Sequence, residues 1–209
     1  MTPRSFLRAV LCASMIVAAS ASAAADVVPQ VARIRTFYET LLDTMKEAQR
    51  TPVRARYAKL EPAIRATFDL PAMTRITVGP TWTTLKPDEQ QGLVEQFSRF
   101  TIATYASRFD GYSGERFEVD DTTEVRGANQ VVRSRLVRPK GEPVTLNYLM
   151  HASGNDWTVI DVYLSGTISE LATRRSEFGT ILRSGGAPAL IDSLKGRTEK
   201  MLAGTPAPS

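Results

Sequence analysis

The apolar residues of this chain change their spacing twice, and these changes limit the folds open to it. From residue 26 to about residue 111, large apolar side chains recur every three or four positions, as on one face of a helix. Between Arg116 and Tyr163 they alternate with polar side chains, as in half-buried strands, and after Gly166 the helical spacing returns. The order of helices, strands and helices predicts an α+β domain with helices packed on one face of a sheet.

Local signals divide these regions into elements. Pro52, Asp69 and Gly111 are typical of helix starts and stops, because proline suits the first turn, aspartate caps the amino end and glycine follows the last turn. The first region therefore predicts four helices, at about residues 26–47, 52–68, 69–79 and 86–111. Turn residues at 139–143 and 153–156 divide the alternating region into about four short strands, which predicts an antiparallel meander.

The first 25 residues predict a secretory signal peptide. Arg4 and Arg8 precede an apolar stretch of about half the length of a membrane span, and small residues then offer cleavage after Ala23 or Ala25. We therefore expect a secreted protein with one domain at residues 26–202 and a disordered tail at 203–209. Cleavage would remove Cys12, the one cysteine, so the core alone would hold the fold.

The chain lacks the residues from which most catalytic and metal sites are built. His151 is the one histidine, and the sequence contains no phosphate-binding loop, dinucleotide-binding glycine pattern or nucleophile elbow. Asp161 alternates in phase with apolar residues, and we expect a buried carboxylate bonded to backbone or arginine. The net charge of +4 falls to +2 without the two leader arginines, too little to indicate a nucleic-acid partner. These features predict a protein that is not an enzyme and needs no cofactor or metal.

Two features remain open at this point. Arg133, Arg135, Arg138 and Lys140 form a basic strand edge, which is either a solvated face or a surface for phosphate headgroups. The many large apolar side chains fit either an ordinary filled core or a hollow one, and periodicity does not distinguish the two.

The order of several motifs is similar to that of the MlaC family, the periplasmic auxiliary lipid carriers of bacterial ABC systems. The similarity covers about residues 30–200 and rests on motifs at residues 68–70, 73–75, 85–91, 157–162, 166–169 and 174–178, together with Trp82 and Tyr148. One branch of the family accompanies hopanoid biosynthesis, the HpnM-like proteins, and membership of that branch is left open. The resemblance implies a twisted antiparallel sheet of about four strands packed against several helices, with an apolar pocket between them.

The resemblance also implies a function and partners. We expect a monomeric carrier that shuttles a phospholipid or hopanoid-type lipid between inner- and outer-membrane transport complexes, with the acyl chain in the pocket and the headgroup outside. Each methylene left in water costs about 0.8 kcal/mol, so such a carrier needs an apolar cavity larger than about 300 Å³. The alternative is a non-enzymatic assembly partner of envelope or hopanoid machinery, with a filled core and no ligand.

Strand phase and the family resemblance together give a list of candidate site residues. The expected lipid-binding residues are Leu70, Met73, Ile76, Trp82, Phe97, Phe100, Phe109, Leu146, Tyr148, Met150, Trp157, Val159, Phe178 and Ile181. The expected headgroup or partner contacts are Arg133, Arg135, Arg174 and Arg175.

Overall fold

The computed structural model describes residues 28–204. The leader expected at residues 1–25 and the last five residues of the expected tail lie outside the described part.

Five α-helices and two short 3-10 helices form in the described part. The helices are α1 (Pro29–Glu47), α2 (Val53–Thr67), α3 (Leu70–Val78), α4 (Pro87–Arg108) and α5 (Glu170–Leu202), and the 3-10 turns are Ala48–Arg50 and Gly79–Thr84. The local signals act as expected, since the Asp69 carboxylate accepts a hydrogen bond from the Ala72 N–H at the start of α3. Helix α5 bends at Gly186, whose φ of 67° interrupts the helical backbone.

The five strands form one antiparallel sheet. They are β1 (Arg116–Arg126), β2 (Asn129–Val137), β3 (Val144–Ser153), β4 (Asp156–Leu164) and β5 (Ile168–Ser169), in spatial order β1-β2-β3-β4-β5. Four of them are the expected meander. The fifth is a two-residue strand paired with Tyr163 and Leu164 of β4, and it is too short to show an alternating pattern in the sequence. The α+β class is confirmed.

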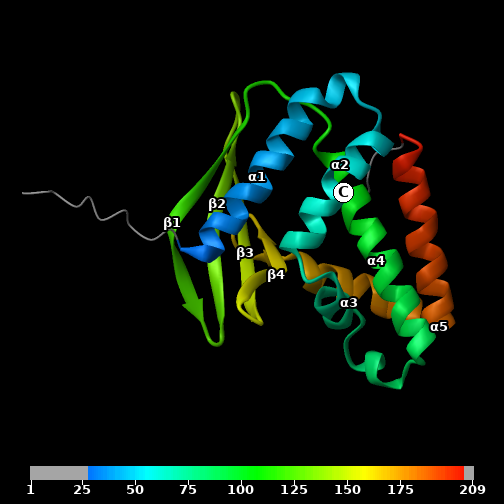
Figure 1. The fold of residues 1–209 in the computed structure, drawn as a ribbon. Helices are drawn as coiled ribbons and strands as arrows, with labels where there is room; N and C mark the ends of the chain where they lie inside the picture. Colours follow the sequence, from blue (N-terminus) through cyan, green and yellow to red (C-terminus); the bar gives the residue numbers. More distant parts are fainter. Residues whose placement is uncertain (1–27, 205–209) are drawn as a thin grey trace, which may run out of the picture.

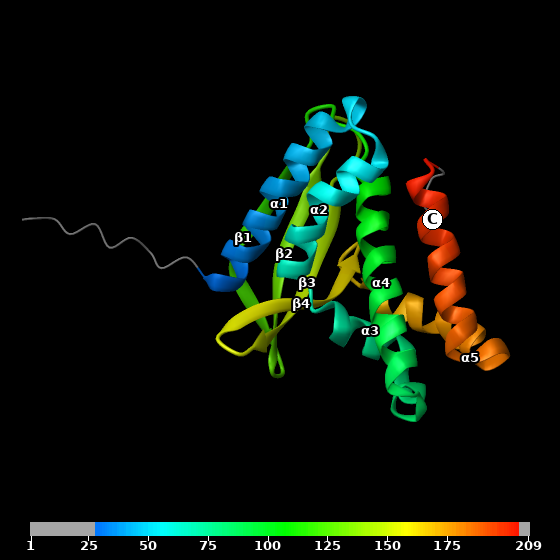
Figure 2. The same ribbon diagram turned by 45° about the vertical axis from the view of Figure 1, so that its right-hand side comes forward.

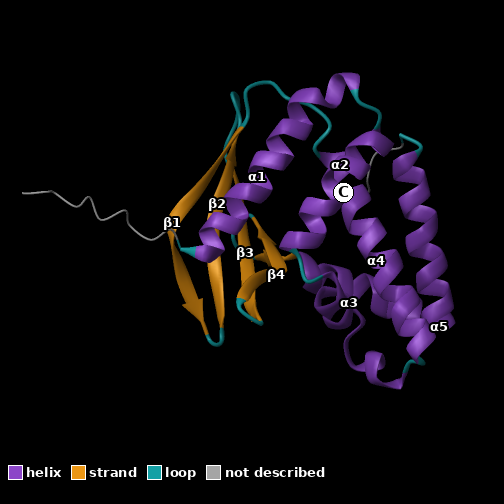
Figure 3. Ribbon diagram, viewed as in Figure 1, coloured by secondary structure: helices purple, strands orange, loops and turns teal. Residues whose placement is uncertain are grey.

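The helices gather on one face of the sheet and beyond its β4 side. Helix α1 lies across the sheet, in contact with β1, β2 and β4, while α4 packs against α2, α3 and α5 farther from it (Figures 1 and 2). Figure 3 shows this division into a strand layer and a larger helical part. Side chains of β2 alternate accordingly, with Val132 and Ser134 buried and Arg133 and Arg135 exposed on the other face.

A cluster of aromatic rings joins the sheet to the helices. The ring centre of Phe37 on α1 lies 5.3 Å from that of Phe68, 5.5 Å from that of Tyr105 and 6.5 Å from that of Tyr148. All three arrangements are edge-on, which is a favourable geometry for aromatic pairs. The cluster fixes α4 relative to β3.

Within residues 28–204, no helix combines the length and apolarity needed to cross a bilayer.

Candidate functional site

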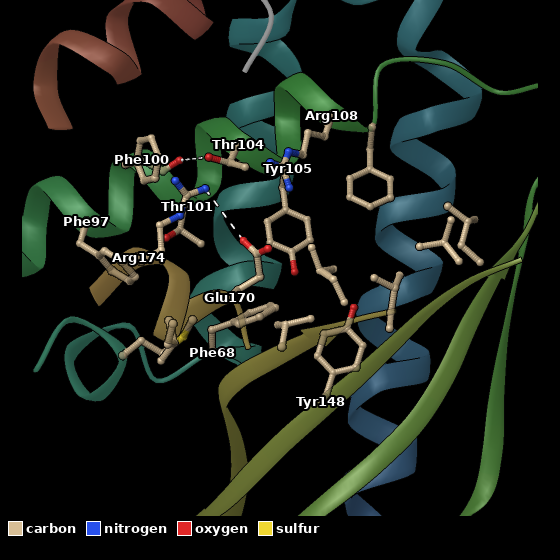
Figure 4. Close-up of a pocket in the computed structure, with 18 residues that line it drawn as sticks. Phe68, Phe97, Phe100, Thr101, Thr104, Tyr105, Arg108, Tyr148, Glu170 and Arg174 are labelled. Carbon is tan, nitrogen blue, oxygen red and sulfur yellow. Dashed lines mark hydrogen bonds and ion pairs between the residues drawn. The ribbon is translucent and has the colours of Figure 1, made fainter. Parts of the chain in front are cut away.

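A cavity of about 280 Å³ lies between α4, the first turns of α5, α3 and the inner face of the sheet (Figure 4). Its volume is slightly below the limit of about 300 Å³ expected from the sequence and close to the lower end for ligand pockets. Apolar and aromatic side chains make up most of the lining: Phe68, Met73, Phe97, Phe100, Tyr105, Phe109, Leu136, Val144, Leu146, Tyr148, Val162, Leu164 and Leu171. The other lining residues are Thr101, Thr104, Arg108, Glu170 and Arg174.

Burial divides this lining into a floor and a mouth. The floor is the buried set, which consists of Phe68, Met73, Phe97, Phe100, Leu146, Tyr148, Val162 and Leu171. The mouth is the partly or fully exposed set, which consists of Thr101, Thr104, Tyr105, Arg108, Phe109, Leu136, Val144, Leu164, Glu170 and Arg174. All the polar lining side chains except the Tyr148 hydroxyl therefore belong to the mouth, and the floor is otherwise apolar.

Two periodicities bring these residues to one cavity. On α4 the lining residues recur at intervals of three and four from Phe97 to Arg108, which places them on one helix face. On the sheet they alternate, as at Val144, Leu146 and Tyr148 of β3.

Asp161 fixes the start of α5 beside the cavity. Its carboxylate accepts hydrogen bonds from the N–H groups of Val162, at 2.8 Å, and Leu171, at 3.2 Å, and from the Ser169 hydroxyl. The expectation of a buried carboxylate bonded to backbone is confirmed. Because Ser169 also caps α5 through the Ala172 N–H, this one group positions the helix turn that carries Glu170.

Three tyrosines, Tyr38 on α1, Tyr105 on α4 and Tyr148 on β3, group beside the cavity. The Tyr38 hydroxyl is 2.6 Å from the Ser134 hydroxyl, which donates to the Leu146 carbonyl. Burial raises the pKa of Tyr38, Tyr105 and Tyr148, because a buried phenolate would lose its hydration. These hydroxyls therefore stay neutral well above neutral pH.

Arg174 is the most buried cation of the mouth, with 15% of its side chain exposed. Its guanidinium lies over the Phe100 ring, 4.9 Å from the ring centre. Its Nη1 is 3.4 Å from Glu177 Oε2, and its Nη2 is 3.9 Å from Glu170 Oε2. Arg174 is thus held by an aromatic face and by two carboxylates.

The structure brings seven of the expected site residues together at the cavity: Met73, Phe97, Phe100, Phe109, Leu146, Tyr148 and Arg174. Four others, Leu70, Met150, Val159 and Phe178, are buried elsewhere in the core. Trp82, Trp157 and Ile181 pack partly buried against that core, and Ile76 on α3 is 40% exposed.

The expected basic contacts are also divided. Arg133 and Arg135 lie on the outer face of the sheet, where they form ion pairs with Glu124 and Glu118 of β1. They do not reach the cavity, because alternate residues of a strand point to opposite faces. Arg175 is exposed and its guanidinium lies against Gly79.

Sequence reasoning missed the remaining eleven lining residues, which are Phe68, Thr101, Thr104, Tyr105, Arg108, Leu136, Val144, Val162, Leu164, Glu170 and Leu171. The available signal was the spacing on the fourth expected helix, since Thr101, Thr104 and Arg108 continue the face of Phe97 and Phe100.

The solitary histidine has a structural role. His151 Nε2 lies 2.9 Å from Oδ2 of Asp69, the residue that caps α3, so the contact joins β3 to the start of that helix. Within residues 28–204, no three histidine, cysteine, aspartate or glutamate side chains are grouped as metal ligands would be.

Comparisons with known proteins identify the fold and the family of this chain. The chain resembles a solved structure of the phospholipid-binding protein from Ralstonia solanacearum, which is in complex with a phospholipid. The TM-score is 0.73 and the sequence identity 24%, over 83% of this chain and 99% of the other. No curated protein sequence matches. The family model described as MlaC protein matches residues 35–196, which is more than half of the chain, and the chain therefore belongs to the MlaC family.

Proposed function

We propose that this protein is a periplasmic carrier that binds one lipid, a phospholipid or a hopanoid-type lipid, and shuttles it between inner- and outer-membrane complexes without covalent chemistry. The acyl chain occupies the cavity and the headgroup stays at the mouth. The observation that carries the proposal is the cavity itself, with an apolar floor and polar side chains confined to the mouth. The phospholipid in the solved structure from Ralstonia solanacearum supports the choice of ligand.

The energetics fit an amphiphile with one long tail in the floor. A chain of about fifteen carbons left in water would cost about 12 kcal/mol, at about 0.8 kcal/mol for each methylene. A lining of phenylalanine, leucine, valine and methionine removes that cost without a directed bond. Binding of this kind is reversible, which is what transfer between membranes requires.

The cavity favours a carrier over the alternative of an assembly partner, because that alternative required a filled core. It also required an apolar patch on the exterior. The large apolar side chains exposed in residues 28–204 are Ile76, Tyr112, Val125 and Ile168, which come from four separate segments of the chain.

The proposal is tested by expressing the full chain with its leader and purifying it from the periplasmic fraction. Native mass spectrometry is expected to show one lipid bound to each chain, and extraction followed by lipid mass spectrometry identifies it as a phospholipid or a hopanoid. Incubating the delipidated protein with donor vesicles, and then with acceptor vesicles, is expected to move labelled lipid between them. A protein that stays empty in every preparation, and after exposure to vesicles, would contradict the proposal.

A further inference from the structure

We infer that the mouth selects a headgroup that carries both a phosphate and a primary amine, because Arg174 and Glu170 present a cation and an anion side by side in the cavity lining. The inference rests on the proposed function and names the lipid class that this site prefers. Phosphatidylethanolamine has this chemistry, whereas phosphatidylglycerol has the phosphate alone.

The two side chains are one helical turn apart at the start of α5. Both line the cavity, and 15% of Arg174 and 27% of Glu170 are exposed, so each is shielded but reachable. In Figure 4 their charged ends point toward one another, with Glu170 beside the Tyr105 ring. The Asp161 carboxylate bonded to the Leu171 N–H fixes this turn, so the pair is presented by a rigid element.

Arg174 is suited to the phosphate. A guanidinium has five N–H donors in a planar fork that matches phosphate oxygens, and the contacts with Phe100 and Glu177 hold its plane in place. Arg108 is a second guanidinium of the mouth, on the facing helix α4.

Glu170 is the group that a phosphate alone does not satisfy. Its Oε2 forms an ion pair with Arg174 Nη2 at 3.9 Å, a distance that is too long for a hydrogen bond. When a tail fills the cavity and expels water, this carboxylate loses hydration, and an ammonium would compensate by donating hydrogen bonds to it. A headgroup with phosphate but no amine would instead place a second anion near the carboxylate.

The experiment compares two lipids with the same acyl chains. Delipidated full-length protein is incubated with vesicles that contain equal amounts of palmitoyl-oleoyl phosphatidylethanolamine and palmitoyl-oleoyl phosphatidylglycerol, and native mass spectrometry measures the ratio of the two bound lipids. For the wild-type protein we expect an excess of phosphatidylethanolamine of about tenfold, the size of one partly shielded charged hydrogen bond. For Glu170→Gln we expect a ratio near one, because the group that would bind the ammonium has lost its charge.

Glu61→Gln is the matched control. Glu61 on α2 also forms an ion pair with an arginine one turn later on its helix, Arg65, but it does not line the cavity, and we expect this variant to keep the preference. Circular dichroism checks that both variants are folded. A wild-type protein that binds both lipids equally, or a Glu170→Gln variant that keeps the preference, would overturn the inference and leave the carrier function intact. Binding of neither lipid would contradict the carrier function itself.

Discussion

Replacing Val162 with aspartate tests whether the floor holds the hydrocarbon tail. Val162 lines the cavity from β4 and is 7% exposed. In the empty protein, water that enters through the mouth would hydrate an aspartate carboxylate at this position. A bound acyl chain would displace that water and would offer the carboxylate no hydrogen-bond donor. An unpaired charge removed from water costs several kcal/mol. Taking about 4 kcal/mol, we expect Val162→Asp to weaken lipid binding about a thousandfold at pH 7.

The assay is lipid retention by native mass spectrometry after exposure to vesicles, with urea unfolding to monitor the fold. Val125→Asp makes the same change on β1, where the side chain is 73% exposed, and we expect it to retain lipid normally. Val162→Thr keeps the shape and replaces one methyl group with a hydroxyl, so we expect it to preserve the fold and to weaken binding by about tenfold.

The pH dependence of this variant has a definite sign. Loss of hydration is costly for the charged carboxylate but not for the neutral acid. Lipid retention by Val162→Asp is therefore expected to recover as the pH falls and the aspartate takes up a proton. Folded Val162→Asp protein that retains lipid as well as Val125→Asp at pH 7 would show that the tail lies elsewhere.

Three further predictions address the fold and the outer face of the sheet. Because Tyr38, Tyr105 and Tyr148 have a raised pKa in the folded state, the native protein binds up to three more protons than the unfolded chain above pH 10. The contribution of these three tyrosines to the free energy of unfolding is therefore constant below that pH and falls by about 4 kcal/mol per pH unit above it, as urea titration should show. Ionisation of all six tyrosines together in the native state, seen in the ultraviolet spectrum, would contradict this. Phe68→Ala removes a buried ring from the centre of the aromatic cluster and is expected to lower the free energy of unfolding by about 3–5 kcal/mol, whereas a loss below about 1 kcal/mol would show that the cluster does not hold the fold. Arg135→Glu changes the outer face of the sheet, opposite the face that lines the cavity, so it is expected to leave lipid retention unchanged and to alter docking to membrane complexes. A loss of retention would place that outer face in the lipid site.

Much of the fold could be predicted from the sequence, because its elements are long enough to show their periods. The expected helix at residues 86–111 corresponds to α4 at Pro87–Arg108, where Pro87 and a glutamate that accepts from the Lys86 N–H define its start. The two-residue strand β5 has no period to detect, and its existence depends on pairing with β4.

The site was less predictable, because a period identifies the face of an element but not how far a cavity extends along it. Met150 and Val159 are paired neighbours on β3 and β4 and are buried in the core, but they do not line the cavity. Val159 instead forms a backbone bridge with Phe68, which does line it. The charged members of the mouth were overlooked for another reason. Arg108 and Glu170 come from opposite ends of the sheet region in sequence, and nothing local shows that α4 and α5 bring them to one cavity.

The burial pattern of the lining also affects how a lipid would be passed from one membrane complex to the other. The exposed lining residues lie on α4, at the strand termini and in the first turns of α5, and a lipid that enters over this rim would also leave over it. Donor and recipient would then have to engage one common surface in turn, and each delivery would require release from the first before contact with the second.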